Sequence, residues 1–76
     1  MKEKVIEIIA VVLECKPETL DENSGLGRHY KWDSLGHVGI MVALEEHFPI
    51  HIDESNIEQL LTINQILDYL EQYVSH

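Results

Sequence analysis

One helix start in the middle of the chain constrains the fold most. A polar, glycine-containing loop ends at Asp33 and Ser34, and an apolar pattern with helical spacing begins there. Asp and Ser are favoured where helices start, because their side-chain oxygens accept hydrogen bonds from the free N–H groups of the first turn. We therefore predict a helix from about Ser34 to His47, which Pro49 ends by disfavouring the helical conformation of the residue before it.

Apolar side chains fall on two neighbouring faces of this predicted helix. The first face should pack into the core, with His37 at its edge, and consists of His37, Ile40, Met41, Leu44 and Phe48. Leu35, Val38 and Val42 form the second face. Since one stripe is enough to pack a helix in a small bundle, the second allows two interpretations. Either the helix is buried over a broad surface, or the second stripe is a partner-binding face.

The rest of the chain predicts further helices and a long connection. Residues 3–15 read as a buried helix, because the apolar run does not alternate as a half-buried strand would. The connection over 16–33 is long, and Leu20 and Leu26 would pin it to the core. Trp32 would either plug this loop or contact a bound group, and we favour the plug.

The C-terminal third predicts one short helix and one long helix. Asp53 would cap a helix over 54–60, and Thr62 with Gln65 forms the sequence pattern of a capping box. The last helix shows clean helical spacing of its apolar residues, which are Ile63, Ile66, Leu67, Leu70 and Val74. The predicted fold is all-α: a small four-helix bundle over 1–76, with three main helices, one short helix and a long first loop.

Composition limits the class of protein and its partners. The 76 residues make one small domain, and the formal charge of −9 would repel nucleic acid and anionic membranes. Basic patches on other proteins are the natural partners of such a surface, and we expect a monomer. No stretch is apolar enough to span a membrane, Glu3 and Glu7 interrupt the signal-like N-terminus, and Cys15 has no disulfide partner. We predict a cytoplasmic protein, with Cys15 in its core.

Two other kinds of chemical site are disfavoured by the sequence. His47 and His51 have the spacing of zinc ligands on a helix, but Pro49 breaks that helix. Asp33 and Ser34 could be combined with His29 or His37 as a nucleophilic triad, but no oxyanion-hole motif accompanies them. We predict no metal site and no catalytic residue.

Three segments together resemble the acyl carrier proteins. They are Asp33-Ser34-Leu35, then Val42-Ala43-Leu44-Glu45-Glu46-His47-Phe48, then Ile50-His51-Ile52-Asp53. The resemblance implies that Ser34 bears a covalent 4'-phosphopantetheine arm, attached by a phosphopantetheinyl transferase from coenzyme A, with Asp33 and Leu35 beside it. The thiol of that arm would hold acyl groups, sheltered among apolar residues such as Ile40, Leu44 and Ile57, during fatty-acid, polyketide or specialised lipid synthesis.

The resemblance also implies a surface for partner enzymes. Acyl-loading and acyl-transfer enzymes with basic docking patches would meet the second helix at Leu35, Val38, Val42, Glu45 and Glu46. The competing interpretation of the acidic residues is an ordinary solvated face.

The sequence departs from the family pattern on both sides of the serine. Gly36 stands where an acidic residue is common, and residues 27–32 are basic and aromatic, so we predict a specialised pathway rather than housekeeping fatty-acid synthesis. Gly36 and Gly39 would either admit a partner backbone or loosen the first turns. The alternatives are an aminoacyl or peptidyl carrier, a docking module without the arm, in which Ser34 only opens the helix, and a small hydrolase.

Overall fold

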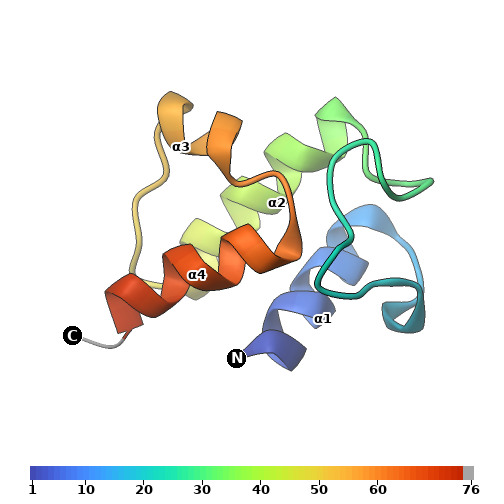
Figure 1. Cartoon of the computed structure of the whole chain (residues 1–76), viewed down its shortest axis with the longest axis horizontal. Coiled ribbons are helices and arrows are strands. Elements are labelled where there is room, and N and C mark those ends of the chain that lie inside the picture. The colour runs from blue at the N-terminus through green and yellow to red at the C-terminus, as the bar shows by residue number, and fades with distance from the viewer. Residues whose placement is uncertain (75–76) are drawn as a thin grey trace.

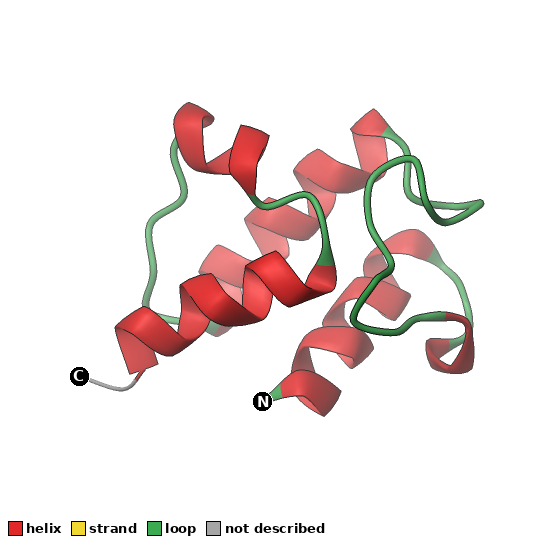
Figure 2. Ribbon diagram, in the orientation of Figure 1, coloured by secondary structure: helices red, strands yellow, loops and turns green. Residues whose placement is uncertain are grey.

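The computed structural model describes residues 1–74, and their side chains through residue 72. It consists of α1 (Lys2–Leu13), the short 3₁₀ helix η1 (Pro17–Thr19), α2 (Ser34–His47), α3 (Glu54–Gln59) and α4 (Ile63–Val74). Helices and loops make up the whole of this described part, as Figure 2 shows. The predicted all-α bundle with a long first loop is confirmed.

The helices leave one end of the bundle to the long first loop. α1 packs along α2 and also contacts α4. Figure 1 shows the connection between α1 and α2 gathered at the end of the bundle where α2 begins. An isolated antiparallel bridge between Gly25 and Thr62 joins this connection to the start of α4. The loop is therefore attached to the bundle at the start of α4.

The end of α1 lies two residues earlier than predicted. Glu14 adopts the left-handed conformation, with φ 54° and ψ 47°, so the helix cannot continue through it. The N–H groups of Glu14 and Cys15 then bond back to the carbonyls of Val11 and Ala10, at 3.3 and 3.0 Å. Such bonds satisfy carbonyls that the end of a helix leaves free. α2 has the predicted bounds.

Both predicted caps of the C-terminal helices are confirmed. The Asp53 carboxylate accepts from the Asn56 N–H at 3.0 Å, and the Asn56 side chain accepts from the Asp53 N–H at 3.3 Å. At the start of α4, Thr62 Oγ1 accepts from the Gln65 N–H at 3.2 Å, and Gln65 Oε1 accepts from the Thr62 N–H at 3.1 Å. Each pair satisfies donors that a helix start leaves free.

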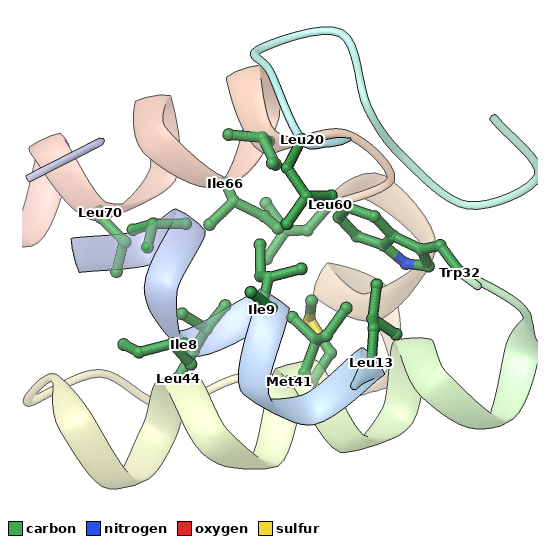
Figure 3. Close-up of a cluster of buried hydrophobic side chains, with 14 of the residues drawn as sticks. Ile8, Ile9, Leu13, Leu20, Trp32, Met41, Leu44, Leu60, Ile66 and Leu70 are labelled. Atoms are coloured by element: carbon green, nitrogen blue, oxygen red, sulfur yellow. The ribbon is translucent and has the colours of Figure 1, made fainter. Parts of the chain in front are cut away.

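One apolar core joins the helices, and Trp32 lies at one end of it (Figure 3). Leu20 is buried and Leu26 is half-buried, so the long loop is pinned as predicted. Cys15 is only half-buried. The predicted inward side chain of Val74 lies outside the described residues. The largest fully buried side chains are Trp32, Ile9, Ile40, Met41, Leu44, Ile63, Ile66, Leu70 and Val5.

Two glycines of α2 make room for α1. A Cβ added to Gly36 would lie 2.7 Å from Leu13 Cδ2, and one added to Gly39 would lie 3.1 Å from Val12 Cγ1. The two glycines therefore let side chains of α1 approach the α2 backbone closely. This internal packing explains the two glycines directly. The two predicted roles were to admit a partner backbone or to loosen the first turns, and neither is needed to explain them.

Candidate functional site

The start of α2 presents a serine whose hydroxyl is free. Asp33 is the N-cap residue, and its carboxylate accepts from the Gly36 N–H at 2.8 Å. Ser34 is therefore the first helical residue rather than the cap, and it is exposed. Among the described residues no group hydrogen-bonds to the Ser34 hydroxyl. A nucleophile is thus held at a fixed position beside the backbone N–H groups and the positive end of the helix dipole.

The residues predicted to flank the serine are brought together by the helix start. Asp33 fixes the first turn through its cap, and Leu35, on the other side of Ser34, is 83% exposed. Backbone N–H groups at such a helix start favour a bound anion. The arrangement can therefore accept a phosphate ester on Ser34 without displacing a buried group.

Trp32 and His37 lock the inner side of this helix start. Trp32 is 1% exposed and His37 is 3% exposed. Trp32 Nε1 donates to His37 Nδ1 at 3.0 Å, and His37 Nε2 lies 3.1 Å from the Ile57 carbonyl oxygen. Because Nδ1 accepts, Nε2 carries the proton and donates to Ile57, which is the neutral form of the ring.

This pair corrects one prediction and confirms another. The prediction that His37 lies at the edge of the core is wrong. Both ring nitrogens have hydrogen-bond partners, so the whole side chain is buried without an unpaired polar atom. The predicted role of Trp32 as a plug is confirmed by its burial. Nothing in the sequence spacing of the two residues predicted their hydrogen bond, since the loop conformation between them decides it.

The second apolar stripe of α2 faces solvent. Leu35, Val38 and Val42 are 83%, 52% and 51% exposed, respectively. The interpretation of α2 as a broadly buried helix is therefore wrong. An apolar stripe that the fold does not use is typical of an interaction surface.

The two glutamates predicted beside this stripe have different surroundings. Glu45 is half-buried, accepts from the Ile52 N–H at 3.3 Å, and lies 3.5 Å from His51 Nδ1. It therefore helps to hold the segment between α2 and α3. Glu46 is exposed, which leaves its carboxylate open to a partner.

Three further features concern other kinds of site in the described part of the chain. Residues 1–74 contain no group of three or more His, Cys, Asp or Glu side chains placed to hold a metal ion. No helix among them is long and apolar enough to cross a membrane. Ile40 and Leu44 are fully buried in the core, whereas Ile57 is half-buried, so a shelter for an acyl chain among them stays a prediction.

Comparison with known proteins points to one family. Residues 3–70 match the family model described as the phosphopantetheine attachment site. An acyl carrier protein of Thermosynechococcus vestitus is 33% identical over 73 residues, covering 96% of this chain and 90% of that protein. Acyl carrier proteins of Cyanidioschyzon merolae (32%; 93% of this chain, 78% of that protein) and Buchnera aphidicola (31%; 92% and 89%) are also similar.

Proposed function

Since the chain belongs to the phosphopantetheine attachment-site family and is an acyl carrier of that kind, we propose that Ser34 bears the covalent 4'-phosphopantetheine arm. One observation carries the assignment. Asp33 takes the capping hydrogen bond, so the exposed Ser34 hydroxyl has no structural task within the described residues. A serine that served only to cap the helix would be engaged with the first-turn N–H groups instead.

The residues around Ser34 would hold the arm at its root. The N–H groups and the dipole at the start of α2 would stabilise the phosphodiester charge, and Asp33 would keep that helix start rigid. Leu35 would lie beside the root of the arm at the surface. The arm, once bound, supplies a terminal thiol on which acyl groups are held as thioesters.

The chain would act as the substrate of other enzymes rather than as a catalyst. A phosphopantetheinyl transferase would activate the Ser34 hydroxyl, and acyl-loading and acyl-transfer enzymes would then use the arm. The exposed stripe of Leu35, Val38 and Val42, with Glu46 beside it, would dock these partners. Glu45 would contribute less, because its carboxylate is already engaged with the segment after α2.

The pathway would be a specialised one. Support for this comes from the exposed basic and aromatic residues just before Ser34, which are Arg28, Tyr30 and Lys31. An aminoacyl or peptidyl cargo is the alternative within the same class, and loading assays with acyl and aminoacyl donors would separate the two. Cytoplasmic location stays a prediction, which cell fractionation would test.

Intact-protein mass spectrometry tests the attachment site. After incubation with coenzyme A and a broad-specificity phosphopantetheinyl transferase, the native chain should gain the mass of one phosphopantetheine and Ser34→Ala should gain none. Far-UV circular dichroism should show Ser34→Ala folded, since the hydroxyl makes no internal bond. If the native chain gains nothing with several transferases, the chain would have to be a docking module without the arm.

The docking face has its own test. Val42→Ala combined with Glu46→Gln should lower kcat/KM for arm transfer about tenfold, because contacts near the centre of an interface carry most of its energy. Both residues are exposed, so the unfolding midpoint in urea should stay the same. Val11→Ala is the control for the loss of an exposed valine, since Val11 is 78% exposed on α1. Equal kcat/KM values for the two variants would place the docking face elsewhere.

A further inference from the structure

The loop that leads into Ser34 carries local positive charge on a strongly acidic chain. The formal charge of the protein is −9, yet Arg28 and Lys31 both lie in the segment 27–32, called here the tip of the loop, and both are exposed. Among the described residues neither side chain forms an ion pair, whereas Lys2 is paired with Glu22. Figure 1 shows the loop, in green, projecting beyond the start of α2. The tip thus carries two cations without an ion-pair partner a few residues before the attachment site.

Hydrogen bonds hold this tip in one conformation. The Gly27 N–H donates to the Trp32 carbonyl at 3.2 Å, and the Trp32 N–H donates to the His29 carbonyl at 3.1 Å. The His29 ring accepts from the Lys31 N–H at 3.1 Å, so its other nitrogen carries the proton and donates to Thr19 Oγ1 at 2.9 Å. The tip is therefore anchored both to buried Trp32 and to η1.

The anchored imidazole supports an exposed aromatic ring. The rings of His29 and Tyr30 stack with centroids 4.6 Å apart and planes 23° apart. Tyr30 is 75% exposed, so much of its surface stays open to solvent. An exposed, preorganised aromatic ring with a cationic residue on either side in the sequence has the features that bind a nucleotide, in which a base stacks and phosphates pair with Arg and Lys.

We propose that Arg28, Tyr30 and Lys31 form a binding surface for the nucleotide end of coenzyme A, an adenosine 3',5'-bisphosphate group. Tyr30 stacks on the adenine, and Arg28 and Lys31 contact the phosphates. Lys31 lines a shallow groove together with Asp33 and Leu35, the two neighbours of Ser34, so the residue lies close to the serine. This inference rests on the proposed function of Ser34.

The proposed surface would reduce the charge repulsion between the chain and coenzyme A in the transfer reaction. The Ser34 Oγ–phosphorus bond forms, the phosphorus–oxygen bond to the nucleotide breaks, adenosine 3',5'-bisphosphate leaves, and the transferase takes the serine proton. A polyanionic donor must therefore approach a chain that repels anions. Glu14 and Asp33 also line the groove, and their negative charges add to this repulsion. Arg28 and Lys31 offset the repulsion at the reacting serine.

Steady-state kinetics with the full chain test the proposal. Arg28→Gln combined with Lys31→Gln should raise the apparent KM for coenzyme A about three- to tenfold, as expected for two exposed charge contacts. Lys4→Gln combined with Lys16→Gln is the control, because it changes the net charge equally at exposed lysines outside the tip. Tyr30→Ala should raise the same KM about fivefold or more through lost stacking.

A direct binding measurement separates this inference from the attachment site. Adenosine 3',5'-bisphosphate added to the chain without its arm should shift the backbone NMR signals of residues 27–32, and the double tip variant should abolish the shift. Equal KM values for coenzyme A in the tip and control variants, or no such shift, would overturn the proposal. A change confined to the KM for the carrier would also overturn it, because the tip would then contact the transferase itself. The proposed function fails only if the native chain gains no arm.

Discussion

The hydrogen bond between Trp32 and His37 joins two side chains that have almost no contact with water. It connects the last part of the long loop to the first turns of α2. The Nε2 atom of His37 in turn donates to the Ile57 carbonyl in α3. A buried donor or acceptor that loses its partner costs about 1–3 kcal/mol. The position of the Ser34 hydroxyl therefore depends on a polar contact inside the core.

Trp32→Phe should lower the free energy of unfolding by about 2–3 kcal/mol, because it leaves His37 Nδ1 unpaired and removes part of a buried ring. Urea unfolding followed by far-UV circular dichroism measures the change. Tyr30→Phe is the control, since its ring is 75% exposed, and should stay within about 0.5 kcal/mol of the native chain. Equal stability of the two variants would mean that the buried hydrogen bond contributes nothing.

At the scale of elements, the contact between the long loop and the start of α4 depends on one glycine. A Cβ added at Gly25 would lie 2.2 Å from the Leu61 carbonyl oxygen, and the neighbouring Leu26 N–H donates to that same carbonyl at 2.8 Å. Because the obstacle is backbone rather than a flexible side chain, one of the two segments must move.

Gly25→Ala should therefore destabilise the fold by about 2–3 kcal/mol, which the shift in urea midpoint would report. Asn23→Ala is the nearby control, because the Asn23 side chain is exposed and only its backbone N–H bonds to Asp21. A stability of Gly25→Ala within about 0.5 kcal/mol of the native chain would show that the segments separate without cost.

The cap of α3 makes the stability depend on pH. The Ser55 hydroxyl and then the Asn56 N–H hold the pKa of the Asp53 carboxyl below its usual value of 3.8. Since the folded state lowers this pKa, the stabilisation is present above 3.8 and is lost as the pH falls through the folded pKa.

Asp53→Asn keeps a capping side chain but removes the charge. The stability difference between the native chain and this variant should be constant near neutral pH and should shrink below pH 3.8, as urea midpoints measured across a pH series would show. Glu54→Gln serves as the control for loss of an exposed carboxylate in the same turn. A difference that persists at low pH would contradict the capping role of the carboxylate.

Helix periodicity and capping residues predicted most of the helices, whereas contacts between residues far apart in the sequence were not predictable. Asp33, Asp53 and Thr62 mark helix starts through local chemistry, so α2, α3 and α4 begin as expected. The burial of His37 and the contact of Gly36 with Leu13 depend on how the loop and α1 pack. The position of Ser34 was predictable, but the fact that Asp33 leaves its hydroxyl free required the structure.

The whole molecule carries an excess of negative charge that opposes its compact state. Fourteen acidic residues face five basic ones, for a formal charge of −9. Raising the NaCl concentration from about 10 mM to about 0.5 M should screen this repulsion and raise the melting temperature by ~5 °C. Calorimetry of Glu3→Gln combined with Glu18→Gln should show a smaller increase, because these carboxylates are exposed. An unchanged melting temperature would mean that the charges are too far apart to repel.

The two sides of α2 separate the requirements of folding from those of the proposed docking of partners. Ile40, Met41 and Leu44 belong to the core, whereas Leu35, Val38 and Val42 do not. Mutations on the outer side are consequently free to accumulate under selection for new enzymes, without a loss of stability that would have to be compensated elsewhere. The same independence makes α2 a practical place for engineering, where the outer residues can be exchanged as a set to redirect the carrier while its scaffold is kept.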